Sequence, residues 1–169
     1  MQGRDADRRT PIAVVVGRAR VELATVGELA ALRGGCAVTV VPEPLFRSLP
    51  TRIADGTLVQ GIVDAYGRVD LTPVALLAGG ARAEFGDAGE IVQCGYANLP
   101  VWPIPSRVFR ALPRVPRNGT YLRDAEDLAV YRIVAGQRLP VSPSRLAGPA
   151  RVWAVPARVL DHLEADPRG

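Results

Sequence analysis

The side chains that most often carry out acid–base and nucleophilic catalysis are scarce in this sequence. Histidine is the commonest general base, and the chain has one, His162. Because a nucleophile, a base and an orienting group must lie within hydrogen-bond reach of one another, a single histidine argues against a catalytic triad and a histidine-rich metal site. Its position in the last predicted helix favours an exposed helix-end residue. We therefore expect no catalytic residues and no enzyme activity.

Carboxylates are the other side chains with catalytic or metal-binding potential. They cluster in two predicted loops, at Asp124, Glu126 and Asp127 and at Asp64 and Asp70. Loop carboxylates can bind calcium through their oxygens, but this spacing matches neither an EF-hand nor a nonapeptide repeat. Solvated turn residues explain them better, so we predict no metal and no other cofactor. An enzyme that uses Asp124 and Asp127 ranks last among the alternatives.

Arginines are concentrated in one stretch, at Arg107, Arg110, Arg114, Arg117 and Arg123. A surface that binds nucleic acid combines such a patch with interleaved aromatic residues. Phe109 lies inside the stretch, but its spacing from other apolar residues assigns it to the core. Polyanion binding, to nucleic acid or to an anionic wall polymer, is therefore an alternative function, and we do not expect nucleic acid as the main partner.

Two tryptophans hold equivalent places in the chain. Trp102 and Trp153 each follow a valine at the start of a predicted strand, and Thr39 takes this place in an earlier stretch. A repeated tryptophan on an exposed sheet face could stack on a sugar or contact a protein. The alternative, which we favour, is that the indole packs at a seam between neighbouring parts of the fold.

Composition is typical of a folded soluble protein. Hydrophobic residues make up 48% and charged residues 22%, which argues against disorder beyond the polar first segment. All 21 basic residues are arginines, and the net charge of +4 is scattered among carboxylates. No apolar run reaches the length of about 18 residues that a membrane span needs, and the first residues lack the apolar core of a signal peptide. Cys36 and Cys94 permit one disulfide but have no metal-ligand spacing, so the compartment stays open.

Three stretches of the chain share one order of strands, turns and helices. Each begins with an apolar run that meets a glycine-centred turn and returns through an alternating strand with a central arginine. Glycine supplies the positive φ that tight hairpin turns need. The arginines, which we predict to face solvent as edge-strand charges do, are Arg20, Arg82 and Arg138. The predicted hairpins cover residues 12–23, 74–85 and 130–141.

A helix start follows each hairpin. Thr25 and Asp87 each begin a capping box, in which the first side chain accepts from a backbone amide and a glutamate three residues later reaches back. Ser142, followed by proline, also suits a helix start. The predicted helices cover residues 26–33 and 88–94, and a shorter third helix follows Ser142.

The third strand of each stretch ends at a proline, in residues 38–42, 101–105 and 152–156. A short amphipathic helix follows, with apolar residues at positions i, i+1 and i+4 on one face. These triads are Leu45, Phe46 and Leu49; Val108, Phe109 and Leu112; and Val159, Leu160 and Leu163.

Strong Asp-Gly and Asn-Gly turns recur at residues 55–56 and 118–119, and the repeated motifs together give a repeat length of roughly 50 to 63 residues. Units this small expose an apolar face, so they must stack or close into a ring with pseudo-threefold symmetry. The predicted fold is α+β and β-rich, built from three tandem β-hairpin/helix/strand/helix repeats. The divisions are a polar tail over residues 1–11, a partial repeat 1 over 12–55, repeat 2 over 56–117, and a C-terminally truncated repeat 3 over 118–169.

This order of motifs resembles a tandem repeat found in exported and cell-surface proteins of actinobacteria and other bacteria. The shared features are a Gly-Thr-Leu-Val strand, an apolar strand ending in Gly-x-Arg, a capped helix, and a Val-rich strand before Pro-x-x-Leu/Val-Phe. The fuller Val-Tyr-x-Ile-x-x-Gly form is matched best by residues 130–136. The resemblance covers nearly all of residues 12–163, implies a surface or binding module, and supplies no catalytic residues. The lack of an export signal in the chain departs from the family's usual setting.

We therefore expect a non-catalytic recognition or spacer module of an exported bacterial protein. Its partner would be a protein or a cell-wall carbohydrate polymer, and its candidate binding residues are Trp102, Trp153, Arg107, Arg110, Arg114 and Arg117. Its location would be extracellular or at the cell surface if the chain is a mature fragment. The alternatives are a structural subunit of a larger assembly, such as a phage tail or a secreted toxin particle, and polyanion binding.

Overall fold

The strands of this protein form three separate sheets. The computed structural model describes residues 11–32, 39–142, 144, 146 and 150–165. Strand residues (34%) outnumber helical residues (22%), so the fold is α+β and β-rich, as predicted. None of the helices in these ranges is long and apolar enough to cross a membrane.

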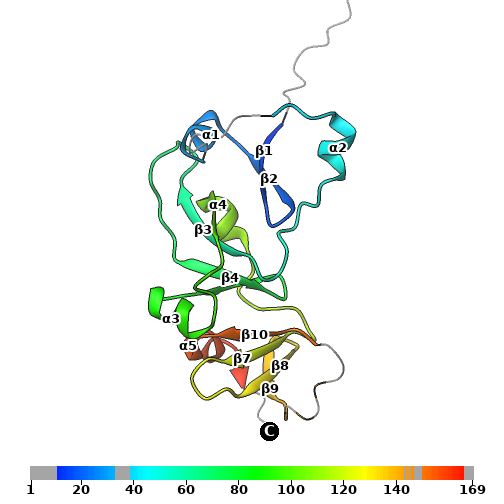
Figure 1. Cartoon of the computed structure of the whole chain (residues 1–169), viewed down its shortest axis with the longest axis vertical. Coiled ribbons are helices and arrows are strands. Elements are labelled where there is room, and N and C mark those ends of the chain that lie inside the picture. The colour runs from blue at the N-terminus through cyan, green and yellow to red at the C-terminus, as the bar shows by residue number, and fades with distance from the viewer. Residues whose placement is uncertain (1–10, 33–38, 143, 145, 147–149, 166–169) are drawn as a thin grey trace, which may run out of the picture.

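The smallest sheet, here called the hairpin sheet, lies at one end of the molecule (Figure 1). It consists of β1 (Ile12–Val16) and β2 (Ala19–Leu23), which pair antiparallel. Their two-residue turn has positive φ at both positions, 52° at Gly17 and 66° at Arg18. Two helices follow this hairpin, α1 (Val26–Leu32) and α2 (Glu43–Ser48).

The middle sheet has the strand order β5-β4-β3-β6. Its central strand β3 pairs antiparallel with β4 and parallel with β6. Helix α3 precedes β6, and helix α4 follows it. The bounds are β3 Leu58–Val63, β4 Val74–Ala78, β5 Ala81–Glu84, α3 Ala88–Gln93, β6 Val101–Pro105 and α4 Ser106–Ala111.

The C-terminal sheet has the strand order β10-β7-β8-β9-β11. Its strand β7 also lies between an antiparallel hairpin, β8–β9, and a parallel strand, β10. The short strand β11 extends the other edge, parallel to β9. The bounds are β7 Tyr121–Asp124, β8 Val130–Val134, β9 Gln137–Pro140, β10 Val152–Val155, α5 Ala157–Asp161 and β11 Glu164–Ala165.

The three hairpins turn in the same way. Gly79 and Gly80 have φ of 57° and 78°, and Ala135 and Gly136 have φ of 51° and 81°. Positive φ at both central residues matches the right-handed twist of the flanking strands. The predicted glycine turns are therefore confirmed, and Arg18 and Ala135 adopt a conformation that costs a non-glycine residue energy.

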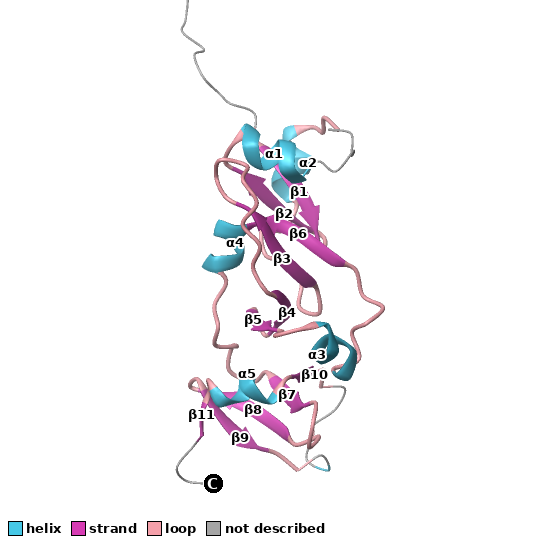
Figure 2. Cartoon of the chain, turned by 90° about the vertical axis from the view of Figure 1, so that its left-hand side faces the viewer, coloured by secondary structure: helices cyan, strands magenta, loops and turns pink. Residues whose placement is uncertain are grey.

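The sheets are stacked in a row along the long axis, and the middle sheet contributes to two cores (Figures 1 and 2). Alternating side chains of its strands point to opposite faces. Val59, Ala75 and Leu77 pack toward the hairpin sheet, in a first core that also holds Val16, Val21, Ile104 and Phe109. Leu58, Leu76 and Phe85 pack toward the C-terminal sheet, in a second core that also holds Leu122, Ile133, Val155 and Leu160. Because the hairpin and C-terminal sheets lie at opposite ends, the described residues do not close a ring.

One predicted strand is wrong. Residues 39–42 are not in a strand, although the matching residues form β6 and β10. Strands β6 and β10 are held by β3 and β7, and no described strand occupies that position beside β1. The tail over residues 1–10, Cys36, Val38, and most of the third predicted helix, including Pro143, lie outside the described residues.

Candidate functional site at the sheet junctions

One arginine contacts a capping glutamate and a strand-end carbonyl across the C-terminal junction, which lies between the middle and C-terminal sheets. Arg158 of α5 donates from Nε to Oε1 of Glu90 at 2.9 Å and from Nη2 to Oε2 at 2.9 Å. The same Nη2 donates to the carbonyl oxygen of Glu84 at 2.8 Å. Glu90 also accepts from the backbone amide of Gly86 at 2.6 Å, and its own amide donates to Asp87 Oδ1 at 3.0 Å. The predicted capping box is confirmed, and its glutamate also ties two sheets together.

This arrangement stabilises the charged form of both side chains. Hydrogen bonds from Arg158 hold the pKa of Glu90 below its usual value, and this effect outweighs the partial burial that would raise it. The amide of Gly86 lowers the pKa further. The hydrogen bonds to Glu90 likewise raise the pKa of Arg158.

The N-terminal junction, between the hairpin and middle sheets, uses the same set of contacts. Arg107 of α4 donates to both carboxylate oxygens of Glu28, at 2.7 and 3.0 Å, and to the carbonyl oxygen of Glu22 at 2.8 Å. Glu28 accepts from the amide of Ala24 at 2.7 Å, and its amide donates to Thr25 Oγ1 at 3.1 Å. The Glu28 side chain is 0% exposed, so this carboxylate depends wholly on these donors.

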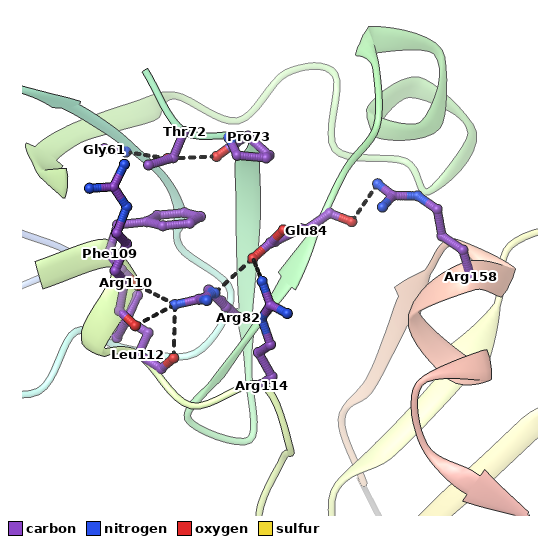
Figure 3. Close-up of polar contacts among 10 residues, drawn as sticks. All are labelled: Gly61, Thr72, Pro73, Arg82, Glu84, Phe109, Arg110, Leu112, Arg114 and Arg158. Atoms are coloured by element: carbon purple, nitrogen blue, oxygen red, sulfur yellow. Dashed lines mark hydrogen bonds and ion pairs between the residues drawn. The ribbon is translucent and has the colours of Figure 1, made fainter. Parts of the chain in front are cut away.

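An arginine of β5, beside the turn of the middle hairpin, has its side chain directed against the end of α4 (Figure 3). Arg82 donates from Nη1 to the carbonyl oxygens of Phe109, Arg110 and Leu112, at 2.6 to 3.0 Å, and from Nε to Glu84 Oε1 at 2.8 Å. Its guanidinium also lies 5.1 Å from the centroid of the Phe109 ring. These carbonyls lie at the end of α4, where only that of Phe109 also accepts from a backbone amide of the helix end, that of Leu112, so Arg82 acts as a side-chain cap of the helix. The side chain is 8% exposed, and the prediction that it faces solvent is wrong.

The matching arginines of the other hairpins are also turned inward. Arg20 donates to the carbonyl oxygen of Phe46 at 2.8 Å and lies 4.8 Å from the centroid of that ring. Arg138 lies 5.5 Å from the centroid of Tyr131 and 3.6 Å from Asp161. Their side chains are 16% and 24% exposed. An alternating strand pattern shows which face of the strand a residue lies on, but it does not reveal that another element covers that face. Sequence reasoning therefore missed that these arginines contact neighbouring elements.

The four candidate binding arginines are each paired with a carboxylate. The pairs are Arg107–Glu28 at 2.7 Å, Arg110–Asp70 at 2.7 Å, Arg114–Glu84 at 3.5 Å and Arg117–Asp55 at 3.3 Å. The carboxylates come from distant parts of the chain, which is why the sequence suggested an unpaired patch. Pairing offsets the positive potential that a polyanion would need, so this geometry does not favour a polyanion site.

The two tryptophans have different surroundings. Trp153 on β10 is 7% exposed and packs against Gly56 in the turn before β3. Arg151 covers its ring at 4.1 Å from the centroid. Trp102 on β6 is 40% exposed. Trp153 thus packs at the seam between two sheets, while Trp102 is left on the surface as a candidate binding residue.

The loop carboxylates form turns. Asp124 accepts from the amide of Glu126, Asp127 accepts from that of Ala129, both at 2.8 Å, and Asp64 organises a third turn. The exposed His162 caps the end of α5. Within the described ranges no group of three or more histidine, cysteine, aspartate or glutamate side chains could hold a metal ion.

A surface pocket of about 490 Å³ at the C-terminal junction is lined by Cys94, Tyr96, Arg123 and Val130 among others. Burial, together with the negative charge of nearby Glu90, raises the pKa of the Cys94 thiol to about 11. Since the thiolate is the nucleophilic form, Cys94 is unsuited to nucleophilic chemistry. Cys36, the other cysteine of the one disulfide that the sequence permits, lies outside the described residues.

Comparison with protein-family models, with curated protein sequences and with solved structures gives no match to this chain.

Proposed function

We propose that the chain is a non-catalytic repeat module in which three copies of one supersecondary unit are stacked in a row. In this proposal it serves as a recognition or spacer module of an exported bacterial protein. The observation that carries the proposal is that both junctions are made by the same contacts. In each, an arginine two residues after a proline binds the capping glutamate and a strand-end carbonyl of the preceding sheet.

A second kind of contact also occurs at both junctions. The threonine that follows the Asp-Gly or Asn-Gly turn packs on the hairpin turn of the preceding sheet, Thr57 on Gly17 and Thr120 on Gly79. Such nearest-neighbour contacts are how stacked repeat proteins are stabilised. They pack both faces of the middle sheet between its two neighbours, which suits a rod that presents surfaces.

The residue types at the two ends support the same interpretation. The position of Arg107 and Arg158 is taken in α2 by Pro44, which has no preceding sheet to contact among the described residues. The position of Glu28 and Glu90 is taken after the third hairpin by arginine, at residue 145. The pairing residues are thus present where two sheets meet and are replaced elsewhere.

A deletion of one whole period tests the proposal. Removal of residues 56–118 joins Asp55 to Gly119 and preserves the turn, while Arg158 becomes the partner of Glu28. We expect this variant to fold, with native-like circular dichroism and a cooperative urea transition. A deletion of equal length over residues 72–134, which removes the β4–β5 hairpin and leaves β9 without its partner β8, should not fold.

A second measurement tests whether the two junctions are equivalent, which folding of the deletion variant alone does not prove. In the one-period deletion, Arg158→Ala should now lower stability as much as Arg107→Ala does in the full chain, because both would leave Glu28 buried and unpaired. Failure of the deletion variant to fold, or its indifference to Arg158→Ala, would contradict the repeat.

A further inference from the structure

The edge of β1 that faces away from β2 has no strand partner among the described residues. The equivalent edges of β4 and β8 are covered by β3 and β7. On β4, Leu77 donates its amide to Thr57 O at 3.0 Å and accepts from Gly56 N at 2.7 Å. Val15 stands in the same place before its own hairpin turn, so its backbone donor and acceptor are aimed at the open edge.

Apolar side chains beside this edge are exposed where their counterparts are buried. Val15 is 54% exposed, whereas Leu77 and Ile133 are 1% and 0% exposed. Val41 is 38% exposed, whereas Ile104 and Val155 are both 0% exposed. The exposed residues lie on β1 and in the non-strand residues 39–42, the two segments that would flank a strand equivalent to β3. The missing element is therefore a single central strand.

Trp102 marks where the turn before that strand would lie. Its counterpart Trp153 packs on Gly56, the residue two before β3. A Cβ atom placed on Gly56, which has φ of 90°, would lie 2.7 Å from Cη2 of Trp153. Trp102 has no corresponding glycine against its indole among the described residues, and it is 40% exposed.

We infer that the open edge of β1 is a strand-acceptor site, which binds an extended segment donated by a separate protein chain. The segment adds antiparallel to β1 and parallel to residues 39–41, with a glycine under Trp102 followed by alternating apolar residues. Strand addition of this kind obtains affinity from backbone hydrogen bonds and specificity from alternate side chains. This inference rests on the proposed repeat. The partner is an extended peptide segment in which Gly-Thr is followed by aliphatic residues.

The chain supplies its own probe. A synthetic peptide with the sequence of residues 54–63, which contains the Asp-Gly-Thr turn and β3, should bind saturably to the intact protein. We expect a change in Trp102 fluorescence and about tenfold slower hydrogen exchange at the amides of Ala13 and Val15. The amides of the middle sheet should exchange at unchanged rates, because β3 already fills that sheet.

Two controls make the test specific. In the peptide, replacement of the residue equivalent to Gly56 by alanine should abolish binding, because the turn needs positive φ and the methyl group would clash with Trp102. In the protein, Trp102→Phe should remove the fluorescence change and retain folding. A scrambled peptide should not bind.

Several outcomes would overturn the inference. The first is that no binding is detected at peptide concentrations up to about 1 mM. The second is that the scrambled peptide or the alanine peptide binds as well as the original. The third is that the amides of Ala13 and Val15 are already protected by self-association of the protein without peptide. If the one-period deletion folds while the peptide fails to bind, the acceptor site is wrong and the repeat stands. If that deletion fails to fold, the equivalence of the sheets itself is wrong.

Discussion

Arg158 and Glu90 lie 68 positions apart in the chain and are joined by hydrogen bonds of 2.9 to 3.2 Å across the C-terminal junction. The contact links the start of α3 to α5, so one ion pair orients a helix of each sheet. Its counterpart, Arg107 with Glu28, orients α4 against α1. The two pairs differ in burial, because Glu28 is 0% exposed and Glu90 is 24% exposed.

This difference predicts unequal costs for removing the two arginines. Arg107→Ala should lower the free energy of unfolding by about 3 kcal/mol, because it leaves a buried carboxylate without a cation. Arg158→Ala should cost about 1 kcal/mol, because water can solvate Glu90. Urea unfolding at neutral pH measures both. Arg110→Ala, which breaks a more exposed pair with Asp70, is the control and should change stability by less than about 0.5 kcal/mol. Equal costs for Arg107 and Arg158 would contradict this account.

The depressed pKa of Glu90 predicts a loss of stability in acid. Its pKa in the folded state lies below its usual value, so folding favours the ionised form. This contribution is complete above the unfolded pKa and is lost as the pH falls through the folded value. Urea unfolding from pH 7 to about pH 3 should therefore show a smaller acid-induced loss in Glu90→Gln than in the wild type. A slope unchanged by the substitution would show that other carboxylates cause the acid sensitivity.

The buried guanidinium of Arg82 should not tolerate replacement by lysine. Lysine keeps the charge but cannot bond the α4 carbonyls and Glu84 at once, because its ammonium is a single point. We expect Arg82→Lys to lower the free energy of unfolding by about 2 kcal/mol. Arg114→Lys, whose side chain is 71% exposed and which contacts the same glutamate, should cost less than about 0.5 kcal/mol. Similar effects at both sites would argue against helix capping by Arg82.

The hairpin turns predict opposite effects of glycine and alanine. Ala135→Gly should raise stability by about 1 kcal/mol, because the native φ of 51° is costly for alanine. Gly79→Ala should lower it by more than about 1 kcal/mol, because φ is 57° and the added methyl group meets Thr120. Thermal unfolding measures both changes. Ala30→Gly in α1 is the control and should destabilise by about 1 kcal/mol, as expected in a helix.

Local features of this fold could be predicted because they depend on near neighbours in the chain. The hairpin turns and the capping boxes begun by Thr25 and Asp87 are confirmed in position. The first two residues of each apolar triad lie in α2, α4 and α5, and the third lies just past the helix end. Phe109 is buried at 2% exposure, as its spacing indicated. In α2 the triad is partly exposed, and Leu45 is 52% exposed. The amphipathic pattern of a helix identifies its apolar face, but it does not reveal whether a neighbouring sheet covers that face.

The arginines show where sequence reasoning fails. A strand pattern places Arg82 and Leu77 opposite each other in register, yet Arg82 was expected in solvent. Its partners lie 27 to 30 positions away, at the end of a helix whose direction only the packed fold defines. The carboxylate partners of Arg107, Arg110, Arg114 and Arg117 could not be predicted for the same reason, since they come from distant parts of the chain.

By itself, the sequence determined the hairpins, the helix starts and the amphipathic faces, because each of these follows from interactions within a few residues of chain. The tertiary structure alone decided that residues 39–42 form no strand, that the arginines point inward, and that the sheets lie in a row. These outcomes depend on which distant segment supplies the missing backbone hydrogen bonds and counter-charges. A strand cannot persist without a partner, and a buried charge cannot persist without an opposite one.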